Sequence, residues 1–256
     1  MVLAVDIGNT NIVCGILKDD EIISTFRLTT ENSMTSDEYG VMICNIIERR
    51  GVALTDIQAV IVASVVPQIM YSFSNAIVKY FNITPMVVGP GIKTGIRLAN
   101  ENPKEMGADR IADAVAAYQL YGGPVIVVDY GTATTYDVIL ADGTFSVGVT
   151  APGIISSAKT LWQNTAKLPE IEIKKPETIL AKNTIESMQA GLVYGQIGQT
   201  EYIIKTIKCE LGINDIKVVA TGGLGKLISE STNVIDAYDA YLTLKGLNII
   251  YKKNVK

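Results

Sequence analysis

Short apolar segments separated by turn residues dominate the N-terminal part of the chain. Segments 2–5, 12–17 and 21–27 predict three successive strands, with a turn at residues 18–20. Segment 59–66 is apolar throughout, which predicts a strand in the buried middle of a sheet. The N-terminal region is therefore predicted to be built on a sheet.

Helical patterns follow these strands. Thr35 and Glu38 have the spacing of a capping box, and apolar residues recur at helical intervals after them. A second helix is predicted around residues 69–81, followed by a short strand at 86–89. Alternation of strands and helices is typical of an α/β fold.

A clearer helix start lies further along the chain. Asn102 suits the N-cap, Pro103 the first helical position and Glu105 the capping box, so a helix is predicted from there to about Leu120. Later segments predict helices at 184–211 and 240–251, with a strand at 216–220.

The chain then repeats itself. A strand at 125–128 ends in Asp129-Tyr130-Gly131, as the first strand ends in Asp6-Ile7-Gly8. The same offset of 123 residues relates Asp6 to Asp129 and Asp19 to Asp142, so strand, turn and hairpin recur without a gap. This self-similarity predicts two similar α/β halves from a duplicated unit, residues 1–115 and 116–256.

Composition narrows the possible functions. The chain has 256 residues, is 48% hydrophobic and carries a net charge of −4 with a pI near 5.0. It has enough apolar material for two small domains or one large one. The charge argues against general nucleic-acid binding, which needs a basic surface, but leaves small anions open as ligands. No apolar run approaches the roughly 20 residues of a membrane span.

The absence of histidine limits the possible catalysis. It excludes serine–histidine and cysteine–histidine pairs, and leaves a carboxylate as the leading candidate for a general base. The three cysteines, Cys14, Cys44 and Cys209, form no C-x-x-C pair, so neither a disulfide framework nor a thiolate zinc site is predicted. Because Asp6 interrupts the first apolar stretch, no signal peptide is predicted, and a reducing cytoplasm is the expected location.

The first Asp-x-Gly turn has the chemistry of a phosphate-binding loop. Gly8 lets the turn tighten and lets a phosphate approach the backbone. Residues 9–11 add side-chain donors, and Asp6 is an oxygen ligand for Mg²⁺ or its waters. The alternative is an ordinary hairpin turn, in which Gly and Asn are common. The second copy at residues 129–132 favours phosphate binding.

Residues 106–110 are a second candidate site. Gly107 in a first helical turn costs roughly 1 kcal/mol relative to Ala, which is tolerated where a ligand must come close. Asp109 and Asp113 lie one helical turn apart, beside Arg110. A carboxylate there could accept a substrate hydroxyl proton, and Arg110 could hold an anion. The alternative, an ordinary solvated helix face, is the commoner meaning of such a charge pattern.

Residues 221–225, Thr-Gly-Gly-Leu-Gly after the strand at 216–220, are a third candidate. They either pack close to a nucleotide base or ribose, or form a plain strand-to-helix turn. They do not match a dinucleotide fingerprint, and the chain contains no P-loop.

Together these motifs resemble the type III pantothenate kinases of the acetate kinase/sugar kinase/Hsp70/actin superfamily. GADRI between the two Asp-x-Gly turns is specific to this family, whereas a lone D-x-G-x-T indicates only the superfamily. The matching stretches span nearly the whole chain: DIGNTN at 6–11, SVVP at 64–67, GADRIADAVAA at 107–117, DYGTATT at 129–135, APG at 151–153, TAKLP at 165–169, NT at 183–184, ATGGLG at 220–225 and LTLKGL at 242–247.

The resemblance implies two ribonuclease H-like (actin-like ATPase) halves from a duplicated unit, with mixed sheets flanked by helices and ATP in the cleft between the halves. It implies phosphorylation of pantothenate to 4′-phosphopantothenate, the first step of coenzyme A biosynthesis. It also implies a homodimer in which the partner subunit completes the pantothenate site. Two alternatives stay open: a kinase for another small hydroxylated acid or sugar, and a non-catalytic accessory regulatory protein of the same family.

Individual roles follow from the same resemblance. Asp109 is expected to be the catalytic base, Asp129 to bind a monovalent cation (K⁺ or NH₄⁺), and Asp6 to hold Mg²⁺ through water. The expected ATP contacts are Asp6, Ile7, Gly8, Asn9, Thr10, Asn11, Ile12, Val13 and Thr132. The expected substrate contacts are Gly107, Ala108, Asp109, Arg110 and Thr184.

One departure from the family pattern concerns the substrate pocket. Relatives often carry a tyrosine shortly before the Asn-Pro of the central helix, whereas this chain has Leu98-Ala99-Asn100-Glu101. The pantothenate pocket is therefore less firmly implied than the use of ATP.

Overall fold

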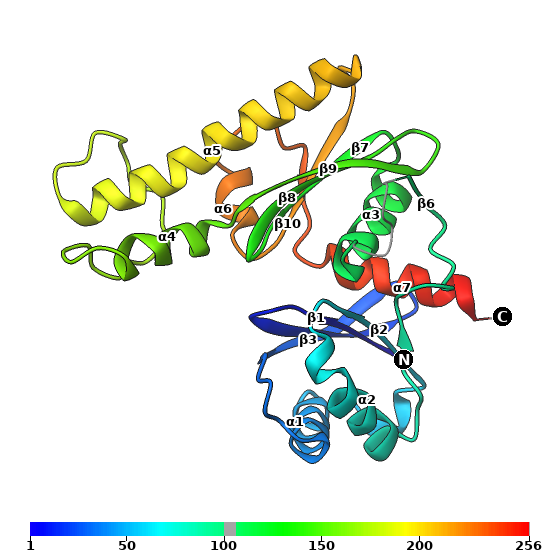
Figure 1. Cartoon of the computed structure of the whole chain (residues 1–256). Coiled ribbons are helices and arrows are strands. Elements are labelled where there is room, and N and C mark those ends of the chain that lie inside the picture. Colours follow the sequence, from blue (N-terminus) through cyan, green and yellow to red (C-terminus); the bar gives the residue numbers. More distant parts are fainter. Residues whose placement is uncertain (100–105, 256) are drawn as a thin grey trace. The chain divides into compact units, whose positions relative to one another are not determined.

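The computed structural model describes residues 1–99 and 106–255 (Figure 1). These residues form two compact units, each built on one sheet. The N-terminal unit contains residues 1–97, 106–116 and 242–255. The C-terminal unit contains residues 98–99 and 117–241.

The N-terminal unit has a five-stranded sheet in the order β3-β2-β1-β4-β5. Its strands are β1 (Val2–Ile7), β2 (Asn11–Lys18), β3 (Glu21–Thr29), β4 (Ala59–Ser64) and β5 (Met86–Val87). The first strand, β1, pairs antiparallel with β2 and parallel with β4. The predicted burial of β4 is confirmed, because this strand lies between β1 and β5.

Helices cover both faces of this sheet (Figure 1). On one face, α1 (Ser36–Arg49) and α2 (Pro67–Phe81) form the core with β1, β2 and β4. The predicted capping box is confirmed: Thr35 and Glu38 each accept the other's backbone N–H at the start of α1. On the other face, α7 (Leu242–Asn254) places Leu244 against Gly15 of β2. A short 3₁₀ helix, η1 (Leu54–Asp56), precedes β4.

The C-terminal unit has a six-stranded sheet in the order β11-β10-β7-β8-β9-β6. Its strands are β6 (Arg97–Leu98), β7 (Val125–Tyr130), β8 (Ala133–Ile139), β9 (Thr144–Pro152), β10 (Lys217–Thr221) and β11 (Ala237–Tyr238). From β9 through β8, β7 and β10 to β11, strand order and directions repeat those from β3 to β5. The predicted pair of similar α/β halves is therefore confirmed.

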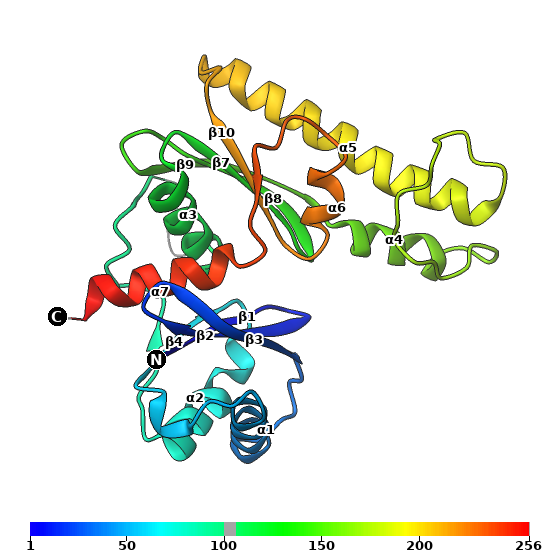
Figure 2. The ribbon, with the colours of Figure 1, turned by 180° about the vertical axis from the view of Figure 1, so that it is seen from behind.

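Four further helices belong wholly or partly to this unit. They are α3 (Ala108–Tyr121), α4 (Ile154–Gln163), α5 (Thr184–Leu211) and α6 (Gly225–Ser229). The long helix α5 begins and ends as predicted, and with α6 it covers the same face of β7, β8 and β10 (Figure 2). Sequence patterns did not predict α4. The helix α3 starts in the N-terminal unit and ends in the C-terminal unit.

The start of α3 differs from the prediction. Met106 and Gly107 are not helical, and the first helical bond runs from the Ile111 N–H to the Gly107 carbonyl (3.2 Å). The placement of Gly107 inside the first turn is therefore wrong, because Ala108 is the first helical residue. The predicted cap at Asn102, Pro103 and Glu105, like Asn100 and Glu101, lies outside the described residues.

The prediction that the two hairpins repeat without a gap is also wrong, because the offset between them changes by one residue. Ile7 and Tyr130 are 123 positions apart, but their register partners, Ile12 and Thr134, are 122 apart. The hairpin turn at Asp142 restores the offset, because it is one residue longer than the turn at Asp19. One residue is therefore missing from the second Asp-x-Gly loop, and one is added at the opposite end of the hairpin.

The C-terminal residues pack with the N-terminal unit. Gly246 of α7 lies so close to the Ala112 carbonyl of α3 that a Cβ there would collide with it. The division of the chain into domains between residues 115 and 116 stays a prediction. The contacts of α7 join it to residues of the N-terminal unit that are distant in the sequence.

Candidate active site

The first loop, residues 6–13, joins β1 to β2 and has Asp6 and Val13 as register partners. It closes with a hydrogen bond from the Gly8 N–H to the Asn11 carbonyl (3.0 Å). Thr30, just after β3, donates its hydroxyl to the Gly8 carbonyl (2.7 Å) and its N–H to the Thr10 carbonyl (3.1 Å). Since protein donors hold these carbonyls, the loop has a fixed shape and exposes residues 9–11 to solvent.

Asp6 lies partly buried at the end of β1, close to Cys14 of β2. Burial, together with the negative charge of Asp6, raises the pKa of the Cys14 thiol. Cys14 therefore stays protonated and does not act as a thiolate nucleophile.

Residues 64–67 link the first loop to the turn before α3 within the N-terminal unit. The Val65 N–H donates to the Ile7 carbonyl (3.0 Å). A Cβ on Gly107 would lie 3.3 Å from Cγ1 of Val65. The Ser64 hydroxyl accepts the Val66 N–H (3.1 Å), which stabilises this connection. Sequence reasoning assigned Val65 no role; the matching SVVP stretch was the available signal.

Asp109 lies partly buried in the first turn of α3. Its Oδ1 accepts the N–H of Arg110 (2.8 Å) and occupies the space into which a Cβ on Gly107 would project. A side chain at position 107 would therefore force the Asp109 carboxylate to shift. The partial positive charge of the helix N-terminus stabilises a carboxylate there.

Asp113, one helical turn further, is only 3% exposed. The interpretation of these residues as a solvated helix face is therefore wrong for Asp113. Asp109 and Arg110 remain partly exposed. Of the two carboxylates, only Asp109 can meet a substrate that arrives from solvent.

The second loop, residues 129–135, joins β7 to β8. Asp129 is paired with Thr135 across the hairpin and with Thr221 of β10. Gly222, whose φ is 89°, lies so close that a Cβ would collide with Asp129 Oδ1, and a Cβ on Gly131 would lie 3.2 Å from Oδ2. The Asp129 carboxylate therefore lies between two glycines, and residues 221–225 form the turn from β10 to α6.

Helix α4 begins against the second loop. A Cβ on Gly153, the N-cap of this helix, would collide with the carbonyls of Gly131 and Thr132. The Ser156 hydroxyl donates to the Thr132 carbonyl (2.7 Å), and the Thr132 side chain is exposed. Sequence reasoning gave Gly153 and Ser156 no role, and the signal that could have found Gly153 was the APG stretch.

The two loop carboxylates suit weakly coordinated cations. Within residues 1–99 and 106–255, no group of three acidic, cysteine or histidine side chains could hold a metal ion. Mg²⁺ keeps several waters and is held by one or two carboxylates together with phosphates, so Asp6 could hold it through water. Gly131 and Gly222 place no side chain against the Asp129 carboxylate, so this carboxylate is a candidate ligand for a monovalent cation.

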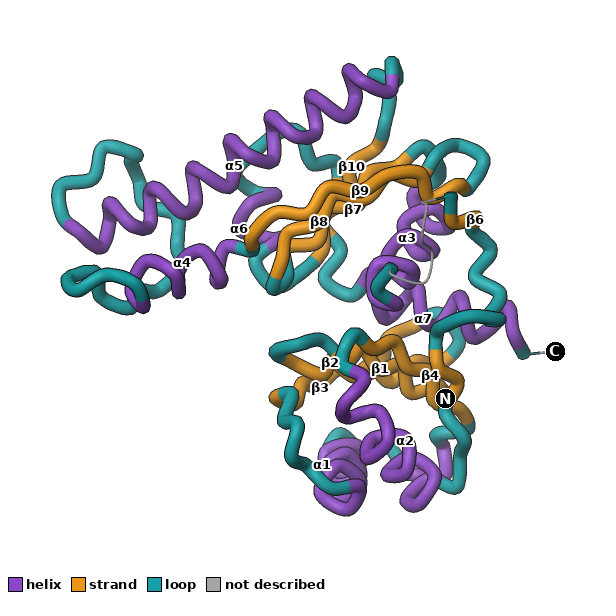
Figure 3. Tube along the Cα trace, in the orientation of Figure 1, coloured by secondary structure: helices purple, strands orange, loops and turns teal. Residues whose placement is uncertain are grey.

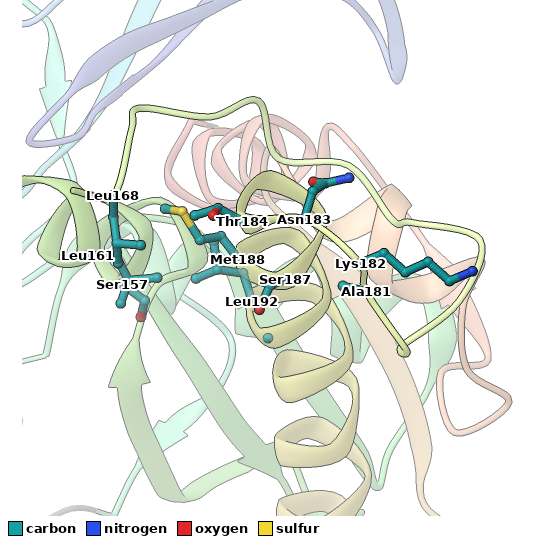
Figure 4. Close-up of a pocket in the computed structure, with 11 residues that line it drawn as sticks. Ser157, Leu161, Leu168, Ala181, Lys182, Asn183, Thr184, Ser187, Met188 and Leu192 are labelled. Carbon is teal, nitrogen blue, oxygen red and sulfur yellow. The ribbon is translucent and has the colours of Figure 1, made fainter.

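Thr184 lies in the C-terminal unit and lines a groove of about 770 Å³ between α4 and α5 (Figure 4). Asn183 caps α5 by accepting the Glu186 N–H (2.9 Å). Residues 164–183 lead from α4 to α5 without regular secondary structure (Figure 3). The remaining groove residues are Ser157, Leu161, Leu168, Ala181, Lys182, Ser187, Met188, Gly191 and Leu192.

Fold and loops together define the class of protein. Two sheets of equivalent strand order, each with an Asp-x-Gly loop after its first strand, are typical of the ribonuclease H-like, actin-like phosphotransferase fold. A Sinorhizobium meliloti protein assigned as a 2-dehydro-3-deoxygalactonokinase has this fold, with a TM-score of 0.65, 14% identity and coverage of 99% of this chain and 97% of that one. A Campylobacter jejuni protein assigned to the Baf family of transcriptional activators gives a TM-score of 0.61 at 20% identity, covering 98% of both chains.

Sequence comparison places the chain more narrowly. The family model for type III pantothenate kinase matches residues 2–206. A type III pantothenate kinase from Agathobacter rectalis is 61% identical over 253 residues, which cover 99% of this chain and 97% of the relative. The chain therefore belongs to the type III pantothenate kinase family. No helix in the described part of the chain is both long and apolar enough to span a membrane.

Proposed function

We propose that this protein transfers the γ-phosphoryl group of ATP to the primary hydroxyl of pantothenate, giving 4′-phosphopantothenate and ADP, the first step toward coenzyme A. Family membership and 61% identity to a type III pantothenate kinase support this proposal. The structural observation that carries it is the position of Val65: its N–H donates to the Ile7 carbonyl of the first loop, and its side chain lies beside Gly107, two residues before Asp109. A phosphate-binding loop and a candidate base are thus joined within one unit.

Asp109 is the general base of this proposal. Its carboxylate accepts the proton as the pantothenate hydroxyl oxygen forms a bond to the γ-phosphorus. The bond from that phosphorus to the bridging oxygen breaks, and ADP leaves with that electron pair. Such a transfer depends on positioning and charge stabilisation rather than on a protein nucleophile, which suits a chain without histidine.

The other proposed site residues bind ATP, pantothenate or cations. Residues 6–13 hold the ATP phosphates, with Thr132 as a further contact. Gly107 and Ala108 contact pantothenate, and Arg110 holds its carboxylate through a charged hydrogen bond. Mg²⁺ held through Asp6 and K⁺ or NH₄⁺ held by Asp129 supply positive charge to the phosphates when they are bound.

We further propose a homodimer in which Thr184 contributes to the partner's pantothenate site. Three large apolar side chains close to Thr184 in the sequence support it: Ile179 is 60%, Leu180 78% and Ile185 50% exposed. Exposed apolar groups that form a contiguous patch commonly mark a protein interface.

A reducing compartment, the cytoplasm, is proposed as the site of action. Its support is that the three cysteines are free thiols, two of them buried.

The test is ADP release with Mg-ATP, with and without pantothenate, for the wild-type enzyme and Asp109→Asn. We expect pantothenate-dependent release that Asp109→Asn lowers by roughly 10²- to 10⁴-fold, the usual contribution of a general base. Asp20→Asn removes an exposed carboxylate that pairs with Lys252, and serves as the matched control with unchanged turnover.

Three results would contradict the proposal. Turnover of Asp109→Asn within a few-fold of wild type removes Asp109 as the base. Wild-type ADP release that ignores pantothenate but rises with another hydroxylated acid or sugar assigns a different acceptor, and ATP binding without any acceptor-dependent turnover favours a regulatory role.

A further inference from the structure

Thr200 connects the middle of α5 to the second loop through buried hydroxyl groups. Its Oγ1 lies 2.9 Å from the Tyr130 hydroxyl and 3.1 Å from the Tyr136 hydroxyl. Thr200 and Tyr136 are 0% exposed and Tyr130 is 3% exposed. Nε2 of Gln196 donates to the Tyr136 hydroxyl (3.3 Å), so one hydrogen-bonded network joins α5 to both strands of the hairpin.

Tyr130 is the central residue of Asp129-Tyr130-Gly131. Successive residues of a strand point to opposite faces, so Tyr130 points into the core below α5 while the Asp129 carboxylate lies on the other face. A hydrogen bond that fixes the Tyr130 side chain therefore also fixes the backbone that carries Asp129 and begins the turn at Gly131.

Comparison with the first loop shows that a buried residue at the position of Tyr130 does not need a hydrogen-bond network. Ile7 holds the place equivalent to Tyr130, is 0% exposed and belongs to an apolar core cluster. Apolar packing fills space with little directional preference, whereas a buried hydrogen-bond network sets one geometry, because each unpaired hydroxyl would be costly. The second loop therefore has a device for exact orientation that the first loop lacks.

We propose that Thr200 is a positioning residue that acts through Tyr130 to orient the Asp129 carboxylate and the turn at Gly131 toward a bound monovalent cation and the ATP phosphates. The inference rests on the proposed function. It predicts that loss of the Thr200 hydroxyl weakens the response to the cation more than it lowers the maximal rate.

The test compares variants by the K⁺ concentration that gives half-maximal ADP release. Thr200→Val keeps the branched shape but removes the hydroxyl, and we expect this concentration to rise about fivefold, the size of one lost hydrogen bond in a binding equilibrium. Thr200→Ser keeps the hydroxyl and should restore the wild-type value. Thr206→Val is the matched control on the same helix, because its exposed hydroxyl donates only to the Tyr202 carbonyl.

A purely structural role gives a different result. If Thr200→Val lowers the thermal midpoint but leaves the K⁺ dependence unchanged, the proposal is wrong. Should Thr200→Val fail to fold, Tyr130→Phe removes one hydroxyl from the loop side of the same hydrogen bond. It should shift the K⁺ dependence in the same direction, and an unchanged dependence would overturn the proposal.

A readout independent of turnover separates this inference from the proposed function. The Gly131 N–H donates to the Ala133 carbonyl (3.1 Å), so its hydrogen exchange reports the shape of the second loop. We expect faster exchange in Thr200→Val than in wild type or Thr206→Val, even if wild-type ADP release proves independent of pantothenate. Equal exchange in all three proteins would contradict the positioning role.

Discussion

The two Asp-x-Gly loops lie at equivalent ends of two equivalent sheets, yet they differ in length and in their surroundings. The first closes from Gly8 to Asn11 (3.0 Å), whereas the second is one residue shorter and closes from Gly131 to Ala133 (3.1 Å). The first loop exposes three polar side chains at positions 9–11. The two sheets thus share their strand order while their Asp-x-Gly loops differ in length and exposed side chains.

The residues packed around the two loops also differ. Behind the first loop, Ile7 joins an apolar cluster and Val65 leads to the turn before α3. Around the second, Gly222 and Gly153 allow neighbouring backbone to come very close. One feature is shared: Thr30 donates to the Gly8 carbonyl and Ser156 to the Thr132 carbonyl, each at 2.7 Å. The proposed phosphate-binding role of the first loop and cation-binding role of the second can be tested against this difference.

The largest expected difference comes from removing each loop's carboxylate charge. Asp6→Asn should lower kcat by roughly 10²- to 10³-fold in either salt, because charge stabilisation at the phosphates is lost. Asp129→Asn should abolish the advantage of K⁺ over Na⁺ buffer. The measurement is the rate of ADP release by both variants in K⁺ and in Na⁺ buffer. If the two variants respond alike to the ions, the division of roles between the loops is wrong.

A smaller effect is expected from the glycine that faces Asp129. Gly222→Ala introduces a side chain at a φ of 89°, against Asp129 and 2.6 Å from the Tyr130 nitrogen. It should lower the free energy of unfolding by about 1–3 kcal/mol and weaken the K⁺ response. Gly223→Ala, which meets no atom within 4 Å, is the matched control. Equal urea denaturation curves for the two variants would show that the close approach at Gly222 is not required.

The smallest expected effects come from the two hydroxyls that fix the loops. Thr30→Val should raise the KM for ATP about fivefold, since a hydrogen bond contributes about 1 kcal/mol. Ser156→Ala should change the KM for ATP less and affect the K⁺ dependence instead, because its exposed bond fixes the second loop. Steady-state kinetics in varied ATP and K⁺ separate the two. A reversed pattern, with Ser156→Ala raising the KM for ATP more, would contradict the assignment.

Local patterns predicted those features that depend on neighbours in the sequence. The capping box of Thr35 and Glu38, the bounds of α5 and the strand order of the first hairpin were all predictable, because capping and alternation act over a few residues. The start of α3 at Ala108 was not predicted, because the capping pattern in the sequence lies several residues earlier, outside the described residues. The short helix α4, of 10 residues, was missed.

By itself, the sequence determined the two Asp-x-Gly loops, the family and the chemistry open to a chain without histidine. Those properties depend on residue type and local spacing. Only the tertiary structure decided that Val65 joins the first loop to Gly107, that Gly222 and Gly153 enclose the second loop, and that α7 packs on the N-terminal sheet. The physical reason is that these contacts join segments far apart in the chain, through close packing and hydrogen bonds that no local pattern encodes.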